Sequence, residues 1–249
     1  MPFTLAHPAL VIPLSKSRYP LSLTGLIIGS MTPDVEFFIQ MREVENIGHQ
    51  WYGILFFDLP LAICLSFLFH NLFRNSFLDN LPNPYRRRFI SSRTFNWNQY
   101  FIKNKFTVLL SIIIGLMSHL IWDGFTHHDG FAVEWITLLS QDIIIANTAL
   151  PIYFALQVLF SIAGMIVVHF QIMQMPTEIE NTDHCNVDLR YWIIFISLIS
   201  GILFMRLCIW PEYNSFGGIM IAGMGSILYS WPIVSFIFHN KLSLLKLKS

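Results

Sequence analysis

The sequence predicts an all-α protein: a polytopic transmembrane helical bundle with five full spans and a short N-terminal half-span or sixth span. Composition is the first reason, because 54% of the 249 residues are hydrophobic and only 12% are charged. A soluble domain usually carries about 25% charged residues, so this chain cannot cover a water-facing surface. Mean hydropathy is +0.56, and long apolar stretches alternate with polar ones, as in multi-pass membrane proteins.

The predicted spans follow from length, because a helix needs about 20 largely apolar residues to cross the hydrocarbon core. The stretches that meet this requirement are Thr107–Trp122, Ile152–Met173, Tyr191–Trp210, Gly217–Phe238 and, with Asp58 and Pro60 inside it, Trp51–Phe69. Leu21–Met31 is only about 17 Å long at about 1.5 Å per residue. We therefore expect it to be a half-span, a re-entrant helix or part of a longer tilted helix.

We expect residues 1–249 to form a single integral membrane domain. Its parts are an N-terminal motif region (1–50), core spans with polar motifs (51–173) and a C-terminal helical pair (190–239). Lys+Arg and Asp+Glu are equal at 15 each, so net charge does not favour nucleic acid as a partner. The three cysteines form no CxxC pair, which leaves no zinc-finger spacing.

Basic residues predict the orientation, because they gather in short cytoplasmic loops. Many of them lie in the loop 71–106: Arg74, Arg86, Arg87, Arg88, Arg93, Lys103 and Lys105. The C-terminal tail is also basic, whereas Asp123–Pro151 has no Lys or Arg. We therefore expect the Arg-rich loop and the C-terminus in the cytoplasm, and 123–151 on the outer side.

Ionisable residues inside a membrane are costly, so each is a candidate functional residue. His119, Asp123 and His127 form an H-x3-D-x3-H motif at the outer end of a span. Residues four apart share a helix face, so all three could converge if the helix runs through Gly124. If Gly124 ends the helix, His119 and Asp123 still pair, and His127 lies on the loop above them. A purely structural hydrogen bond between His119 and Asp123 is the alternative.

Three further polar residues fall at a similar outer depth and are expected to form a structural polar layer: Asp58, Gln157 and Arg206. Asp58 and Arg206 favour an ion pair, because each charge otherwise lacks compensation. Gln157 is typical of interhelical hydrogen bonding.

The N-terminal region adds His7, Asp34, Glu36 and His49. Pro33 disfavours a helical Thr32, so we expect Asp34 to open the helix that continues V-E-F-F-I-Q. An acidic residue there also meets the positive end of the helix dipole, which is its structural explanation.

Six ordered motifs carry a family resemblance: MPFTLAHPA, IGSMTPDVEFF, GHQWYGILFFDLPLA, LFHNLFR, SHLIWDGFTHHDG and YFALQ. In this order they resemble the domain of unknown function 4184 family of bacterial membrane proteins. That family is itself distantly similar to the membrane-bound metal-dependent hydrolases. The resemblance implies a bacterial cytoplasmic (inner) membrane. It places polar motif positions at His7, Asp34, His49, Asp58, His119, Asp123 and His127.

Together, topology and resemblance predict a divalent metal site at the outer membrane–water boundary. Imidazole and carboxylate ligands suit zinc, or alternatively manganese. The predicted ligands are His7, Asp34, His49, His119, Asp123 and His127, with Asp34 or Glu36 as catalytic base. The predicted reaction is hydrolysis of an ester or phosphoester in a membrane lipid or lipid-linked substrate.

The alternative is a non-enzymatic membrane protein, for transport or structure, with a hydrogen-bonded His/Asp core. No nucleophile elbow, Gly-rich phosphate loop or HExxH motif occurs in the sequence, which disfavours serine hydrolases, nucleotide enzymes and zincin proteases.

Overall fold

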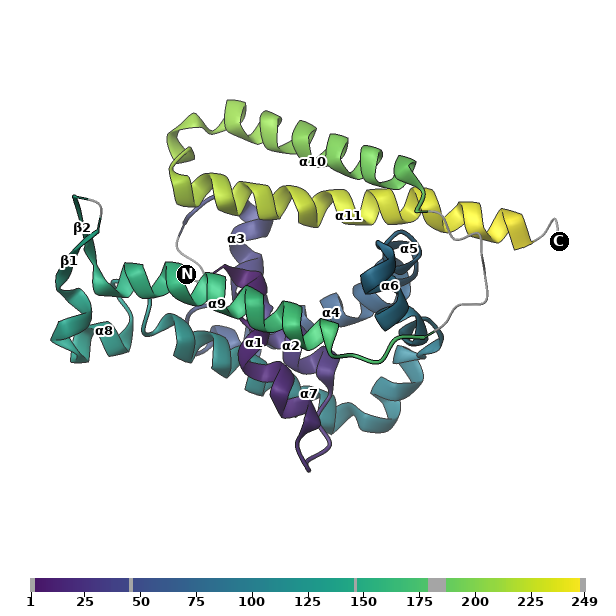
Figure 1. Cartoon of the computed structure of the whole chain (residues 1–249), viewed down its shortest axis with the longest axis horizontal. Helices are drawn as coiled ribbons and strands as arrows, with labels where there is room; N and C mark the ends of the chain where they lie inside the picture. The colour runs from purple at the N-terminus through teal and green to yellow at the C-terminus, as the bar shows by residue number, and fades with distance from the viewer. Residues whose placement is uncertain (1–2, 45–46, 146, 179–186, 247–249) are drawn as a thin grey trace. The chain divides into compact units, whose positions relative to one another are not determined.

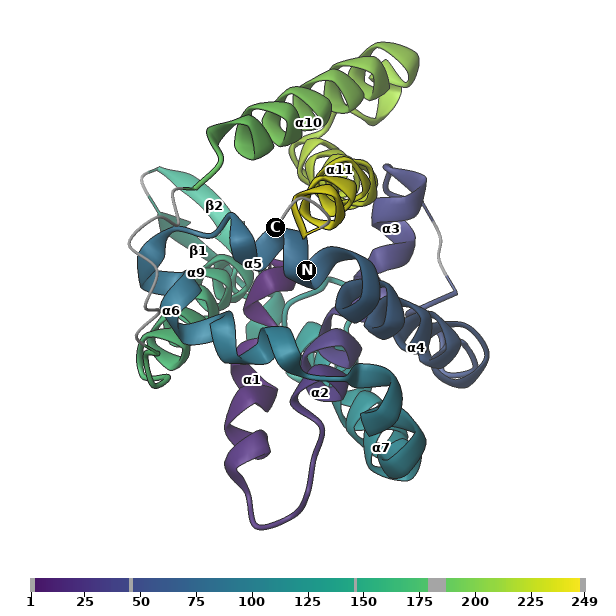
Figure 2. The same cartoon turned by 90° about the vertical axis from the view of Figure 1, so that its right-hand side faces the viewer.

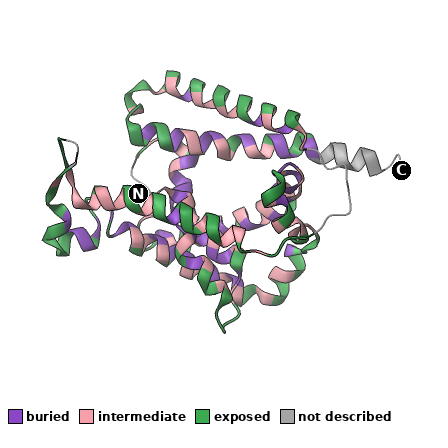
Figure 3. Cartoon of the chain, viewed as in Figure 1, coloured by how far each residue is buried: buried purple, intermediate pink, exposed green. Residues whose placement is uncertain are grey.

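Long apolar helices dominate the computed structural model, which describes residues 3–44, 47–145, 147–178 and 187–246. Within these residues, the helices long and apolar enough to cross a membrane are Ile54–Asp79, Trp97–Asp123, Ile152–Met173, Leu189–Ile209 and Phe216–Phe238. The predicted class, an all-α protein with five membrane-length helices, is confirmed. Many large apolar residues on these helices are exposed, as expected for surfaces that face lipid. Figure 3 shows exposed residues along the lengths of the helices.

Two helices extend beyond the stretches that hydropathy marked. The first runs on from Phe69 to Asp79, and the second begins at Trp97, ten residues before Thr107. Hydropathy reports which residues tolerate hydrocarbon, whereas helical structure can continue through polar residues beyond it. In the second helix the extension is separated from the apolar part by a kink at Asn104, which has φ −126° and ψ 28°. Part of the Arg-rich segment 71–106 is therefore helical.

The chain forms two compact units, each built from separate stretches. The first contains Met1–Asp34, Gly48–Ala62 and Asn104–Gln174, and the second contains Val35–Ile47, Ile63–Lys103 and Met175–Ser249. In the first unit lie α1 (Pro8–Val11), α2 (Leu23–Met31), α8 (Phe131–Trp135), β1 (Asp142–Ile145), β2 (Thr148–Pro151) and α9 (Ile152–Met173). In the second lie α3 (Val35–Gln40), α5 (Arg74–Asp79), α6 (Asn83–Phe89), α10 (Leu189–Ile209) and α11 (Phe216–Lys246). Helices α4 (Leu59–Leu68) and α7 (Trp97–Asp123) contribute to both units.

Helix α2 packs unusually close to α7 because both carry glycine at the contact (Figures 1 and 2). A Cβ at Gly29 would lie 2.4 Å from the carbonyl oxygen of Ile112, and one at Gly115 would lie 2.5 Å from that of Leu26. Small residues spaced in this way allow helix backbones to approach in membranes. Ser22 caps the start of α2 by accepting from the Gly25 amide at 3.2 Å.

Helix α2 has nine residues, fewer than the ~20 a full crossing requires. From the sequence, this segment could be a half-span or a sixth full span, and the observed length of the helix agrees with a half-span. The chain continues as a 3-10 turn, Thr32–Asp34, into α3. Thr32 is helical, with φ −64° and ψ −37°, so the prediction that Pro33 would keep it out of helix is wrong. The short 3-10 turn continues from α2 through Pro33 without a break.

The N-terminal segment is held against α9. The Phe3 amide donates to Ser161 Oγ at 2.8 Å, and a Cβ at Gly164 would lie 2.7 Å from Ala6 Cβ. This tight contact leaves Ala6 and His7 fully buried. The segment from Phe3 to His7 is thereby a fixed part of the first unit.

In the second unit, α10 and α11 form an antiparallel pair (Figures 1 and 2). Its core contains Tyr191, Phe195, Val234 and Phe238, with Trp192 and Trp231 packed around it. Trp192 Nε1 donates to the carbonyl oxygen of Asn80 at 2.8 Å, which ties the pair to the end of α5.

One short hairpin departs from the all-helical prediction. β1 and β2 are antiparallel, with Ile143 opposite Leu150. The run of three isoleucines in β1 favours strand, and Asn147 in the turn has φ 64°, a conformation that asparagine tolerates.

Candidate metal centre

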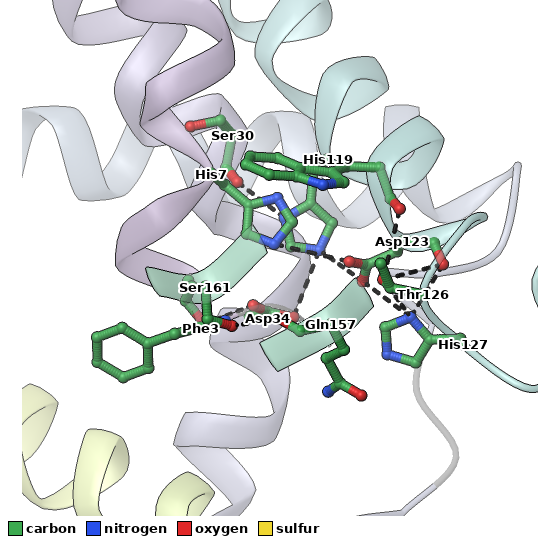
Figure 4. A network of polar contacts seen from close by, with 12 residues as sticks. Phe3, His7, Ser30, Asp34, His119, Asp123, Thr126, His127, Gln157 and Ser161 are labelled. Atoms are coloured by element: carbon green, nitrogen blue, oxygen red, sulfur yellow. Dashed lines mark hydrogen bonds and ion pairs between the residues drawn. The ribbon is translucent and has the colours of Figure 1, made fainter. Parts of the chain in front are cut away.

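Residues from four separate segments of the first unit converge at the C-terminal end of α7. Figure 4 shows His7, Asp34, His119 and Asp123 among them. His119 and Asp123 lie on its last turn, and Asp34 ends the 3-10 turn after α2. His49 lies in the loop before the helix that starts at Ile54. His7 precedes α1.

Four of these side chains each present one ligand atom to a common point: Asp34, His49, His119 and Asp123. Their four ligand atoms lie within 4.8 Å of one another. His119 Nε2 lies 3.4 Å from Asp34 Oδ1 and 3.3 Å from Asp123 Oδ2. His49 Nε2 lies 3.8 Å and 3.5 Å from the same two oxygens.

Three of these four separations, 3.3–3.5 Å, lie in the range for the edges of a tetrahedron around a small divalent cation, and the fourth, 3.8 Å, is slightly longer. With metal–ligand bonds of about 2.0–2.2 Å, tetrahedral geometry places neighbouring ligand atoms about 3.3–3.6 Å apart. Octahedral neighbours with similar bonds would be closer, at about 3 Å. The spacing of the His and Asp atoms therefore favours tetrahedral coordination.

The orientation of His119 is set by its other ring nitrogen. Nδ1 lies 2.8 Å from the carbonyl oxygen of Ser30, so it carries the proton and donates, which leaves Nε2 as the electron-pair donor. Ser30 follows Gly29 on α2. The close packing of α2 on α7 therefore brings this carbonyl to the imidazole.

The two carboxylate oxygens of Asp34 have different partners. Oδ2 accepts from Thr4 Oγ1 at 2.5 Å, and Oδ1 faces His49 and His119. Burial by itself raises the pKa of this carboxyl, but electrostatic attraction to His119 outweighs burial and lowers the pKa below its usual value. The carboxylate is therefore ionised, as a metal ligand requires.

Asp123 is the centre of the arrangement, because both of its oxygens face histidines. Oδ1 lies 3.6 Å from His7 Nε2, and Oδ2 faces His119, His49 and, at 3.8 Å, His127 Nδ1. It is the last residue of α7, so the helix stops before Gly124, which is one of the two predicted alternatives. A Cβ at Gly124 would lie 2.1 Å from the Phe131 ring, so a side chain there would require this ring to move.

His7 stacks on His119, with ring centroids 3.9 Å apart and an interplanar angle of 17°. Trp122 meets the His7 ring edge-on at 5.2 Å. Burial, reinforced by repulsion from His119, lowers the pKa of His7 to about 3. His7 is therefore neutral at physiological pH, and it is not one of the four side chains whose ligand atoms converge.

His127 also lies beside the four. Its Nδ1 lies 3.0 Å from the carbonyl oxygen of Asp123, so the nitrogen nearest the cluster donates to backbone. Burial lowers the pKa of His127. The side chains of His127 and His49 are 29% and 25% exposed, so the otherwise buried cluster is open to solvent on this side.

Several atoms of the cluster have no hydrogen-bond partner in the described part of the chain: His7 Nδ1 and Nε2, Asp34 Oδ1, His119 Nε2 and both carboxylate oxygens of Asp123. Buried polar atoms are almost always hydrogen-bonded. A group of unbonded atoms around one point indicates a site for a cation or for ordered water.

The other predicted residues lie elsewhere. Glu36 belongs to the second unit, where its carboxylate accepts from the Ile47 amide at 2.8 Å and from Gln40 Nε2 at 3.3 Å. Asp58 is fully buried, and a Cβ at Gly48 would lie 2.9 Å from its Oδ1. Asp58 therefore packs against the loop that carries His49, which suits a positioning role.

Gln157 and Arg206 complete the predicted polar layer. The carbonyl oxygen of Gln157 accepts from Ser161 Oγ at 2.7 Å. Arg206, in the second unit, donates to the carbonyl oxygens of Met41 and Tyr213 and to Asn214 Oδ1. Its pairing with Asp58 stays a prediction.

Two supporting groups were not predicted from the sequence, Thr4 and the Ser30 carbonyl. The threonine precedes His7 within the first motif, which is the only local signal for it. A backbone carbonyl carries no residue-type signal at all.

The family comparison covers nearly the whole chain. The family model described as "Domain of unknown function (DUF4184)" matches residues 1–237. The chain belongs to this family. No curated protein and no solved structure matches it.

Proposed function

We propose that the cluster binds a divalent metal ion, zinc or alternatively manganese, and that the protein is a membrane-bound metal-dependent hydrolase. The observation that carries the proposal is the convergence of two imidazole and two carboxylate ligand atoms within 4.8 Å. Nitrogen and oxygen ligands at tetrahedral spacing suit zinc first.

The unbonded atoms support a metal over a hydrogen-bonded structural core. Such a core would satisfy its buried members, because a partly satisfied polar network is costlier than an apolar one. Here both oxygens of Asp123 and Nε2 of His119 lack hydrogen bonds among the described residues. A cation would compensate both the charge and the missing contacts.

For catalysis we assign His49, His119 and Asp123 as ligands and Asp34 as base. Catalytic zinc sites keep three protein ligands and one open position, and the metal lowers the pKa of bound water to about 7. Asp34 Oδ1 faces the same point as the three ligands, while Thr4 holds its other oxygen. Asp34 is thereby placed to take a proton from water.

The substrate we propose is an ester or phosphoester of a membrane lipid or lipid-linked molecule. Asp123 ends a membrane-length helix, so the cluster lies near headgroup depth.

We further propose a bacterial inner membrane, with segment 71–106 and the C-terminus in the cytoplasm. Labelling of a His128→Cys variant in intact cells tests the orientation, because this side chain is 79% exposed. If only a membrane-permeant reagent labels the cysteine, the orientation is the reverse of the one proposed.

Elemental analysis of the protein purified in detergent tests the metal. We expect one equivalent of zinc or manganese in the wild type and in His128→Ala, whose ring lies outside the cluster, and loss of metal in His119→Ala. A wild-type protein without metal after gentle purification would leave the non-enzymatic polar core as the better explanation.

Hydrolysis is tested separately on the metal-loaded protein with chromogenic esters and phosphodiesters. We expect Asp34→Asn to retain metal and to lose turnover at least about 100-fold, as general-base catalysis typically contributes. Equal turnover in the wild type and Asp34→Asn would remove Asp34 from the mechanism. Stoichiometric metal without turnover on any ester would leave a metal-binding membrane protein.

A further inference from the structure

A second polar site lies in the second unit, away from any residue of the metal cluster in sequence. A surface pocket of about 270 Å³ opens between the end of the Ile54–Asp79 helix and the start of α7. Its lining residues are Asn71, Arg74, Arg93, Thr94, Phe95, Asn96, Trp97 and Asn98. The lining contains two arginines and three asparagines but no acidic residue.

Arg74 supplies a buried positive charge. The residue is only 7% exposed. The guanidinium donates to the carbonyl oxygens of Phe95 at 2.7 Å and Arg93 at 3.3 Å, and to His70 Nδ1 at 3.0 Å. No carboxylate lies within ion-pair distance of Arg74 among the described residues. Its charge is therefore met only by neutral dipoles, which compensate a buried cation poorly.

The rest of the lining is rich in donors. Arg93 also lines the pocket. Its charge is partly compensated by Asp79, whose Oδ1 lies 2.5 Å from Arg93 Nη1. Asn71 Nδ2 donates to Asn98 Oδ1 at 3.1 Å, and Asn96 Oδ1 accepts from the Gln99 amide at 3.0 Å. Both residues line the pocket, and with their carbonyl oxygens engaged, the amide N–H groups of Asn96 and Asn98 are what these side chains can offer an anion. A net positive lining with N–H donors selects an anion.

The pocket also lies where lipid headgroups are found. It is at the shared end of two consecutive membrane-length helices, Ile54–Asp79 and Trp97–Asp123. Trp97, 2% exposed, stacks on His70 with centroids 4.7 Å apart, and tryptophan is enriched at membrane–water interfaces. Basic pockets between transmembrane helices at this depth bind phosphate-containing headgroups.

We propose that this pocket binds a phosphate group, with Arg74 and Arg93 as its cationic contacts and the asparagine amides as neutral donors. The proposal is independent of the metal centre. A phosphate group can come from an anionic lipid headgroup or from free phosphate, and the two sources are separated by experiment. The volume, about 270 Å³, is at the lower limit for small-molecule pockets, which suits a headgroup better than a whole drug-sized ligand.

Thermal-unfolding titration of the full-length protein in neutral detergent tests the proposal, because a ligand of the folded state raises the unfolding temperature. The probes are short-chain phosphatidylglycerol and sodium phosphate. Their controls are short-chain diacylglycerol and sodium chloride at equal ionic strength. Stabilisation by phosphatidylglycerol alone assigns a lipid headgroup, and stabilisation by phosphate as well assigns a site that also takes the free anion.

Variants locate the binding. Arg93→Gln removes a cation and Asn98→Asp adds a negative charge at an exposed lining position; each should weaken binding of the stabilising probe about tenfold. The matched control is Arg87→Gln, an exposed arginine of the same basic segment outside the lining, which should bind as the wild type does. The proposal is overturned if neither probe exceeds its control, or if Arg87→Gln weakens binding as much as Arg93→Gln does.

Discussion

Two buried charged groups of this protein, Arg206 and the His/Asp cluster, differ in how far hydrogen bonds satisfy their polar atoms. Arg206 in the second unit is 2% exposed, and its guanidinium donates to Met41 O at 2.7 Å, to Asn214 Oδ1 at 2.6 Å and to Tyr213 O at 3.2 Å. Met41 has φ 54° just past the end of α3, which costs energy for a residue with a Cβ. The backbone is thus arranged to meet the arginine.

In the His/Asp cluster of the first unit, Asp34, His119 and Asp123 are also buried. Asp34 Oδ1, His119 Nε2 and both carboxylate oxygens of Asp123 have no hydrogen-bond partner among the described residues. Burial of charge alone therefore does not indicate a functional site. A charge whose donors are matched internally stabilises the fold, whereas a set of unmatched atoms around one point requires something further to bind there.

Asp123→Asn tests this difference most strongly. The amide keeps the shape but removes the charge that faces the histidines, so metal affinity should fall at least about 100-fold, because loss of an outer-sphere contact alone costs about 10- to 100-fold. Competition with a metal-binding dye measures it. Asp129→Asn, on an exposed neighbour of the same loop, is the control and should bind metal normally. Unchanged affinity in Asp123→Asn would place the metal elsewhere.

Gly29→Leu tests whether the cluster depends on the close contact of α2 with α7. Because a Cβ at Gly29 would lie 2.4 Å from Ile112 O, the helices must separate, at a cost of about 2–3 kcal/mol in stability. Ser30 O then moves away from His119, so metal affinity should fall as well. Gly223→Leu is the control, since nothing lies within 4 Å of its Cβ. Thermal unfolding and metal content measure both effects; equal stability in the two variants would exclude this packing role.

Arg206→Met should do the reverse and affect stability alone. It leaves three oxygen acceptors without their donor, which should cost about 2 kcal/mol, while metal content stays at the wild-type level. Arg190→Met, exposed on the same helix α10, should cost little. Loss of metal in Arg206→Met would break the distinction drawn between the two groups.

Thr4→Val should have the smallest effect. It removes the hydrogen bond to Asp34 Oδ2 without a change in shape, so turnover of the ester substrate should fall about tenfold with little change in metal content or unfolding temperature. Thr137→Val, at an exposed position, is the control. A turnover equal to the wild type would show that Asp34 needs no support from the N-terminal segment.

Local sequence was sufficient for the helical class and for one part of the site. Apolar stretches of the necessary length marked all five membrane-length helices, because lipid requires such a stretch wherever a helix crosses. The pair His119–Asp123 was also visible, since residues four apart share a helix face. The helix ends were less visible, and the helix that starts at Trp97 shows why: polar interfacial residues continue a helix without an apolar signal.

The sequence by itself therefore determined that this is a multi-pass membrane protein and that His/Asp residues are concentrated near the ends of its helices. Only the tertiary structure decided which of them meet. His7, Asp34 and His49 are distant from Asp123 in sequence. His7 and Asp34 reach the cluster through the packing of Ala6 on Gly164 and the glycine contact of α2 with α7, and His49 follows Gly48, which packs against Pro33 and Asp58. Such contacts depend on the distance between backbones, and residue spacing along a single helix carries no information about that distance.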